Sequence, residues 1–289
     1  RKWKTSMNGI LYLGLSIFFS SAVALIMKVV NQQEIHLGQF LAVNYLVCTM
    51  SVLVWGGWKS LDSNTPFLWA LSVFIGIMFV VSLWLFHRAM AVDGLALSTT
   101  LMRLSAALPT LGSLLLFSEQ ADTTTVLGIA LAFLSLPLSS REPVRLKKLK
   151  ENLLQGMIWG LLLFAAYGLT DFSFKIQAEL APSADSKAFM VGIFGTALLL
   201  TLPHLFRDKK PDQKTLFLGS LMGGSNMLST YIWIQALAVI PGSLAYPTLG
   251  LGVITVTTLF SLGLWKEKLR PANFLFLALA SAAVLLLHT

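Results

Sequence analysis

The sequence predicts an all-α integral membrane protein, with ten transmembrane helices arranged as two inverted five-helix repeats around a central cavity. First, 56% of the 289 residues are hydrophobic and only 12% are charged, whereas soluble domains carry about 25% charged residues. Second, apolar stretches of span length recur along the whole chain and are separated by short loops. Third, the second five stretches resemble the first five. Because each copy has an odd number of spans, the second must cross the membrane in the opposite sense.

The apolar stretches are long enough to cross the hydrocarbon core as helices, which satisfy their own backbone hydrogen bonds in lipid. Tryptophans lie near several span ends, as is typical of a membrane interface. The loops are too short to hold a soluble domain. The ten spans are predicted at residues 9–30, 37–56, 66–90, 95–117, 124–140, 153–176, 186–206, 215–238, 243–264 and 271–288.

The duplication is visible at single residues, with an offset of 147 that becomes 148 after one inserted residue. The clearest matches are Lys28 with Lys175, Gly94 with Gly242, and Glu119 with Glu267. A basic segment with several Lys and Arg residues joins the two halves. We therefore expect a first five-helix repeat at 1–140, a basic linker at 141–152 and a second repeat at 153–289.

Composition and motifs exclude several classes of function. The net charge of +8 does not indicate nucleic-acid binding, because the basic residues lie mainly at span ends, where they meet headgroups. The single Cys48 allows no disulfide within the chain, and no two histidines have the spacing of metal ligands. We expect no metal and no cofactor. No catalytic motif is present, so an enzyme, including a membrane-embedded one, is not expected.

The orientation in the membrane is open. Lys and Arg residues are more than twice as frequent in the loops on the side of the 141–150 segment as on the other side. The positive-inside rule therefore places this segment in the cytoplasm and both termini outside.

The repeated motifs resemble those of a known family. An alanine-rich stretch follows span three at 88–92 (RAMAV) and span eight at 235–239 (QALAV). The next span then contains a proline and ends in an acidic residue, Pro109 before Glu119 in one half and Pro247 before Glu267 in the other. These features resemble the drug/metabolite transporter superfamily, in its EamA-like ten-helix branch.

This resemblance implies cytoplasmic termini, which is the reverse of the charge count. It also implies a cavity lined by spans one to four and six to nine, with spans five and ten packed outside. The family moves diverse solutes, so the resemblance names no substrate. The spacing from proline to acid differs between the halves of this chain, at 10 and 20 residues. Individual cavity positions in spans four and nine therefore do not carry over from the family.

Arg103 is the most informative single residue for function. It lies about 5 Å from the midpoint of its predicted span, at 1.5 Å per residue. An arginine at that depth costs roughly 2.5–3.5 kcal/mol on insertion scales, so such residues usually face a cavity. The structural alternative is an ion pair or carbonyl contact that holds two helices together.

Asp171 and Lys175 are one helical turn apart, so a local neutral pair near the interface is expected. In the alternative, Asp171 faces the cavity as the partner of Arg103 or as a proton carrier. Lys28 and Lys175 near the span ends are expected to extend toward the headgroups. If they face inward instead, they are cationic gates on opposite sides of the membrane.

Further candidates for substrate binding are polar or aromatic residues within spans. Two are the amides Asn44 and Asn226, which equally fit hydrogen bonds between helices. The aromatic candidates are Trp84, Tyr167, Tyr231 and Tyr246. Aromatic side chains within spans more often serve packing, but several together form a cage for a cation.

The sequence therefore predicts a secondary transporter that moves a small organic solute by alternating access. Arg103 favours an amino acid or related anionic or zwitterionic metabolite. An exporter of cationic drugs or quaternary amines is the alternative, and a channel or sensor is less favoured. The expected location is the inner or plasma membrane, as a multi-pass protein that is a monomer. A proton or sodium ion is a possible coupling ion, and the direction of transport stays open.

Overall fold

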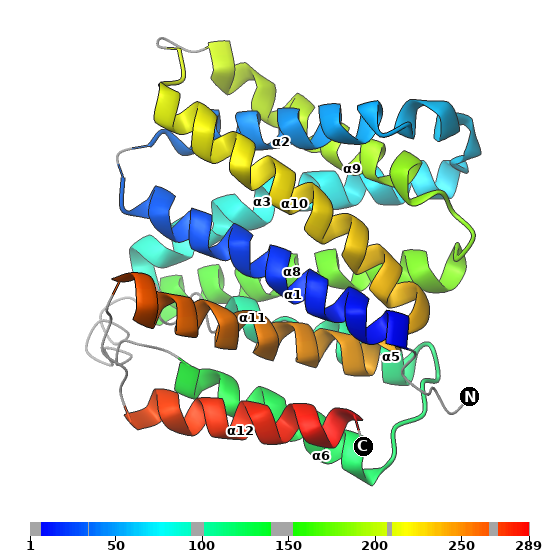
Figure 1. The fold of residues 1–289 in the computed structure, drawn as a ribbon, viewed down its shortest axis with the longest axis vertical. Helices are drawn as coiled ribbons and strands as arrows, with labels where there is room; N and C mark the ends of the chain where they lie inside the picture. The colour runs from blue at the N-terminus through cyan, green and yellow to red at the C-terminus, as the bar shows by residue number, and fades with distance from the viewer. Residues whose placement is uncertain are drawn as a thin grey trace. The chain divides into compact units, whose positions relative to one another are not determined.

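The computed structural model describes residues 7–33, 35–93, 101–139, 153–206, 210–265 and 271–288. Every regular element in these residues is a helix, which confirms the all-α class (Figure 1). Among them, six helical segments are long and apolar enough to cross a membrane. These segments are Met7–Val30, Leu37–Val54, Pro66–Phe86, Ser186–Phe206, Gly242–Leu264 and Pro271–His288. The count of ten membrane spans stays a prediction.

The helices coincide with the predicted spans to within a few residues at most ends. The α-helices are α1 (Met7–Asn31), α2 (Leu37–Val54), α3 (Pro66–Asp93), α5 (Ala107–Leu115), α6 (Thr123–Ser135), α8 (Leu153–Leu180), α9 (Ser186–Thr201), α10 (Gln213–Val239), α11 (Gly242–Trp265) and α12 (Pro271–His288). Short 3-10 helices are η1 (Gly57–Ser63), η2 (Leu136–Ser139) and η3 (Leu202–Phe206). Residues 95–100 of the fourth predicted span and the whole linker at 141–152 lie outside the described residues.

The chain divides into two compact units, and each takes segments from both sequence halves. Unit 1 comprises 1–7, 81–175 and 239–289, and unit 2 comprises 8–80 and 176–238. Helices α3 and α8 each contribute to both units.

In unit 2, α2 packs against α9, and glycines let neighbouring helices approach closely. A Cβ atom on Gly223 of α10 would lie 2.7 Å from the backbone oxygen of Asn44 in α2. A Cβ atom on Gly76 of α3 would clash with the backbone oxygen of Ile193 in α9. Both contacts bring a glycine of one helix onto the backbone of another, which is typical of packing between membrane helices.

The same two helix pairs make a second contact one turn earlier. Gly219 of α10 faces Val43 of α2, where an added Cβ would lie 2.8 Å from the valine Cβ. Gly192 of α9 faces Ser72 of α3, with no room for a Cβ between them. The contacts between α10 and α2 therefore repeat those between α3 and α9.

In unit 1, α6 packs along α12 and α5 packs against α11. A buried apolar cluster joins α6, α11 and α12, with Phe276 fully buried at its centre. A second cluster joins α3 and α8 through Leu85 and Phe86 on one side and Leu163 and Ala166 on the other. These two clusters are the core of the unit and fix α8 beside α3.

The fourth predicted span is interrupted just after Arg103. Residues 101–104 are helical, a turn follows at 105–106, and α5 begins at Ala107. Pro109 explains the break, because it has no amide to donate to Ser105 and its ring would clash with that carbonyl. The Ser105 carbonyl instead accepts from the amide of Leu108 at 3.0 Å, in a tighter turn.

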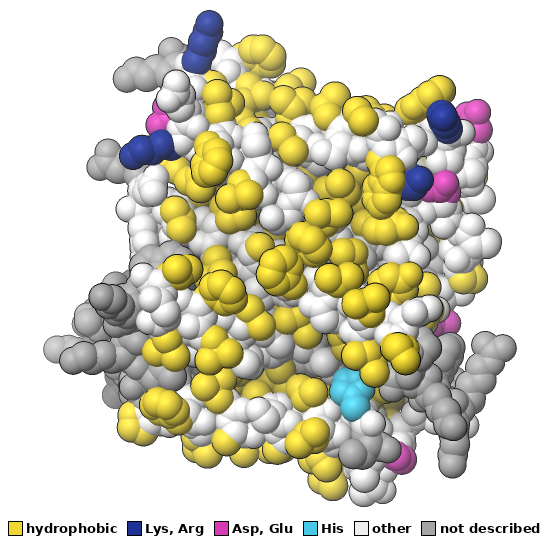
Figure 2. All heavy atoms as spheres, viewed as in Figure 1, with side chains coloured by type: hydrophobic (Ala, Val, Ile, Leu, Met, Phe, Trp, Pro, Cys, Tyr) yellow, Lys and Arg dark blue, Asp and Glu magenta, His cyan; other side chains and the backbone are white. Residues whose placement is uncertain are grey.

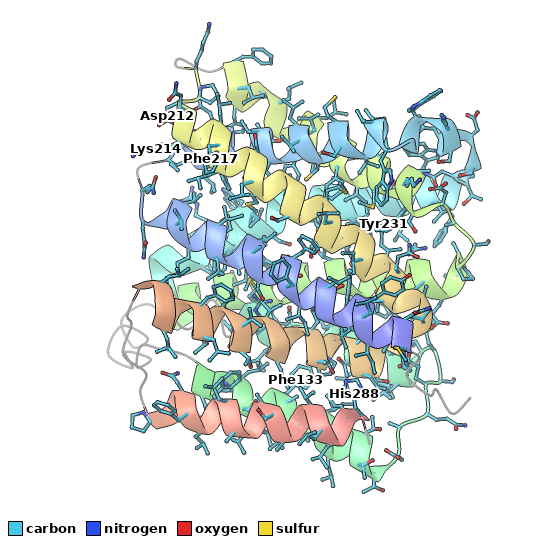
Figure 3. The ribbon with its side chains drawn as sticks, viewed as in Figure 1. Phe133, Asp212, Lys214, Phe217, Tyr231 and His288 are labelled. Carbon is cyan, nitrogen blue, oxygen red and sulfur yellow. The ribbon has the colours of Figure 1, made fainter. Side chains whose placement is uncertain are left out.

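Exposed side chains on the helices are mostly apolar, as expected for surfaces that face lipid. In unit 2, Leu11 of α1 is 58% exposed and Phe217 of α10 is 67% exposed. Figure 2 shows hydrophobic side chains across the visible faces of α1 and α10, whereas the coloured charged side chains lie at the margins. Asp212 and Lys214, labelled in Figure 3, mark one such margin at the start of α10.

Candidate functional site

A polar stripe on one face of α8 is the main candidate site of unit 1. Tyr167, Asp171 and Lys175 follow one another at intervals of four residues, so their side chains lie on the same side of the helix. Arg103, in the short helical turn before the Pro109 break, lies within electrostatic range of both Tyr167 and Asp171. The structure therefore brings together Arg103, Tyr167 and Asp171, three predicted site residues from two separate segments of the chain.

Arg103 and Asp171 are close but are not joined directly. Within the described part of the chain, no ion pair within 4.0 Å links them. Each of Arg103, Tyr167 and Asp171 also keeps part of its surface accessible. A guanidinium and a carboxylate thus interact electrostatically without forming a direct ion pair.

Tyr246 ties α11 to this stripe. Its side chain is 2% exposed, and its hydroxyl donates a hydrogen bond of 2.6 Å to the backbone oxygen of Asp171. Tyr246 also interacts electrostatically with Asp171 and with Glu119. Tyr246 is therefore buried and joins α11 to α8 through this hydrogen bond, and its predicted contact with substrate stays a prediction.

At the far end of the stripe, Lys175 belongs to a cluster centred on Glu119, in the loop after α5. Oε1 of Glu119 accepts from Lys175 Nζ at 2.5 Å and from the Gly242 amide at 2.8 Å. Oε2 accepts from the Ser243 amide at 2.9 Å and from the Ser243 hydroxyl at 2.6 Å. We call these four residues, Glu119, Lys175, Gly242 and Ser243, the Glu119 cluster.

The Glu119 cluster is both an ion pair and a helix cap. The Glu119 and Lys175 side chains are only 7% and 2% exposed, and the carboxylate lies at the amino end of α11, where the helix dipole favours negative charge. Burial raises the pKa of Glu119, but the hydrogen bonds from Lys175 and Ser243 outweigh it and hold this pKa below its ordinary value. The carboxylate is therefore ionised at neutral pH.

Two expectations for Lys175 are wrong. It does not form the predicted local pair with Asp171, because its ammonium instead pairs with Glu119, 56 residues earlier in the sequence. Nor does it extend toward the headgroups, because its side chain is buried and its ammonium also lies 5.7 Å from the centre of the Phe117 ring.

Trp84 belongs to unit 1 but is not enclosed. Its ring lies edge-on to Trp159 of α8, with 5.7 Å between ring centres, and the Arg88 guanidinium lies 5.4 Å from its ring. Trp84 is 48% exposed. Tyr167 and Trp159 both pack against the apolar cluster between α3 and α8.

The other predicted site residues lie in unit 2. Asn44 is fully buried, and its side-chain nitrogen has no partner among the described residues. Asn226 is partly buried in α10. Tyr231, labelled in Figure 3, packs edge-on against Trp55, with 4.6 Å between ring centres. Asn44 thus packs between α2 and α10, whereas Asn226 and Tyr231 keep some exposure.

Sequence reasoning missed Glu119 and Ser243 as parts of a buried cluster. The sequence predicts Glu119 only as the acidic residue that ends the fourth span. The available signal was the repeat, because Lys175 and Glu119 each match a residue of the same type in the other half. Among the described residues, no group of three or more His, Cys, Asp or Glu side chains could hold a metal ion.

Comparisons with known proteins give a fold and two distant relatives. An uncharacterized protein of Haemophilus influenzae is 23% identical over 286 residues, covering 94% of this chain and 96% of the relative. An uncharacterized transporter of Pseudomonas aeruginosa is 30% identical over 142 residues, just under half of each chain at 46%. A crystal structure described only as that of a protein superposes with a TM-score of 0.77, at 14% identity and 96% coverage of both chains. No family model matches the sequence.

Proposed function

We propose that this chain is a secondary transporter that moves a small zwitterionic solute, an amino acid or a related metabolite, across a cell membrane by alternating access. The observation that carries the proposal is the placement of Arg103 and Asp171, which lie within electrostatic range without a direct ion pair. The Pseudomonas relative is described as an uncharacterized transporter, and this description supports the proposal. It assigns no enzymatic step, metal or cofactor.

A zwitterion matches this arrangement chemically. A guanidinium binds a carboxylate through two parallel hydrogen bonds, and a carboxylate binds an ammonium group. A solute with both groups satisfies Arg103 and Asp171 at once and leaves no net charge in an apolar region. The Tyr167 hydroxyl, on the same face of α8, is placed to accept or donate one further hydrogen bond.

The helix break next to Arg103 supports a transport site. Broken helices in transporters expose backbone groups only where they line a substrate cavity. Pro109 forces such a break here, and the turn it creates follows Arg103 directly. A helix break and a charged side chain at the same depth are both costly in lipid. Their cost is lower when both line one polar site.

The reciprocal glycine contacts of unit 2 support the inverted repeat. Helix α10 begins 147 residues after α3, and α9 begins 149 residues after α2. With these offsets, the contact of Gly223 with Asn44 corresponds to that of Gly76 with Ile193. Helices α10 and α2 thus contact each other at the same positions as their repeat counterparts, α3 and α9. A two-fold relation between the halves explains this correspondence. The EamA-like fold, a monomer and coupling to a proton or sodium ion belong to the same proposal.

A second candidate function is export of a cationic drug or quaternary amine. It is favoured by the exposed ring of Trp84 beside Trp159, and by the packing of Trp159 and Tyr167 against one cluster. Such aromatic rings attract cations through their faces. This candidate makes no use of Arg103 as a ligand.

A thermal-shift screen of purified protein in detergent separates the two candidates. The panel contains amino acids, organic acids, phosphosugars, nucleotides and quaternary amines, and it is run on wild type, Arg103→Gln and Asp171→Asn. We expect stabilisation by a zwitterionic class that disappears in both variants while each variant still unfolds cooperatively. Stabilisation by quaternary amines that Arg103→Gln retains would instead support the exporter.

A further inference from the structure

We propose that the Glu119 cluster is an ionic gate that must open and re-form in each transport cycle. This inference rests on the proposed function, because a gate has meaning only in a transporter. The cluster connects three elements of unit 1, namely the loop after α5, helix α8 through Lys175 and the amino end of α11 through Gly242 and Ser243. Helices α8 and α11 cannot separate at this end while the carboxylate holds both.

The chemistry of the cluster makes it two-state. All four hydrogen bonds converge on one carboxylate, and both charges of the ion pair are almost fully buried. A buried charge is tolerated only while it is paired, so a half-open arrangement is strongly disfavoured. The cluster is therefore either fully formed, or open with both charges of the ion pair exposed to water.

Gly242 and Ser113 show how closely the closed state is packed. Ser113 of α5 is fully buried, and its hydroxyl has no partner among the described residues. A Cβ atom on Gly242 would clash with that hydroxyl and would lie 3.1 Å from Cδ of Lys175. The absence of a side chain at Gly242 thus lets α5, α8 and α11 meet around the carboxylate.

The gate is directly connected to the proposed substrate site. Asp171 lies one turn before Lys175 on α8, and Tyr246 lies one turn after Gly242 on α11. The Tyr246 hydroxyl bonds the backbone oxygen of Asp171. A solute that binds Asp171 therefore acts on the same α8–α11 contact that the Glu119 cluster holds closed.

Cysteine accessibility tests the gate without a known substrate. In a Cys48→Ala background, Ser113→Cys places a single thiol in the buried contact beside Gly242. Labelling by a membrane-impermeant maleimide is measured in proteoliposomes of both orientations. We expect Glu119→Gln and Lys175→Met each to raise the labelling rate of the Ser113→Cys thiol more than tenfold.

The matched control is Asp122→Asn, a neutralised carboxylate three residues further on. Asp122 is exposed and caps α6 by accepting from the Thr125 amide at 2.8 Å, so its replacement should leave the labelling rate unchanged. Equal labelling in wild type, Glu119→Gln and Lys175→Met would overturn the gate and make the cluster a static tie. If Glu119→Gln does not fold, Ser243→Ala, which removes one of the four donors, should raise the rate to a smaller extent.

The outcome is distinguishable from failure of the proposed function. If no zwitterionic solute binds wild type but labelling still rises in the variants, the proposed substrate is refuted and the opening of the cluster is not. Normal solute binding in wild type with unchanged labelling in the variants would refute the gate alone.

Discussion

Replacing Glu119 with glutamine removes one charge of a buried ion pair. The amide can still accept hydrogen bonds through one oxygen, but its NH2 group faces the Ser243 amide, which is also a donor. The variant removes the Glu119 charge that faces the buried Lys175 ammonium. Removing one partner of a buried ion pair typically costs about 3–5 kcal/mol.

The assay is thermal unfolding in detergent, followed by tryptophan fluorescence. For a chain somewhat larger than 150–250 residues, about 2 °C of Tm per kcal/mol gives a decrease of roughly 6–10 °C. Ser243→Ala removes only the hydroxyl bond to the carboxylate, about 1.5–3 kcal/mol, and should lower Tm less. The double variant Glu119→Gln with Lys175→Met should lower Tm by less than the sum of the single variants, because it removes both charges of the pair.

The same variant gives a pH dependence with a defined sign. The pKa of Glu119 is lower in the folded protein than its ordinary value of 4.5. Its stabilising contribution is therefore complete above the unfolded pKa and is lost as the pH falls through the folded pKa. Wild type should lose more stability than Glu119→Gln below about pH 4.5. A Tm of Glu119→Gln within about 1 °C of wild type at neutral pH would refute the reasoning.

Three further predictions concern packing and local structure. Gly76→Ala and Gly223→Ala should each lower Tm, because the new Cβ meets a backbone oxygen, whereas Gly224→Ala next door has nothing within 4 Å and should leave Tm unchanged. Pro109→Ala should restore a continuous helix and weaken solute binding in the thermal-shift screen without loss of fold. Asp122→Ala should increase hydrogen exchange of the first-turn amides of α6, because it removes the side-chain acceptor of Thr125.

The positions of the helices could be predicted from the sequence because lipid makes the signal strong. Apolar runs of span length have few other structures available to them, and each of the ten predicted spans contains an α-helix. The interruption in the fourth span was not predicted. Its cause, Pro109, was visible, but whether a proline kinks or ends a helix depends on what the freed carbonyl of Ser105 bonds instead.

The candidate site could be predicted only in part. Depth alone identified Arg103, and helical spacing placed Tyr167 and Asp171 on one face of α8. The partner of Lys175 could not be found from local spacing, because the Asp171 carboxylate four residues away competes with Glu119, which lies 56 residues away in sequence. Additional hydrogen bonds favour Glu119 as the partner of Lys175, because two backbone amides and a hydroxyl of α11 also donate to the Glu119 carboxylate.

The most direct test of the central claim is solute counterflow in proteoliposomes, with the compound that stabilises the protein best in the screen. Liposomes loaded with unlabelled compound should take up labelled compound transiently above equilibrium, and this overshoot should vanish in Arg103→Gln and Asp171→Asn. Two analogues of that compound, one without its carboxylate and one without its amine, should fail to drive the overshoot. A saturable overshoot that Arg103→Gln retains, or uptake that is not stimulated by internal solute, would contradict the account.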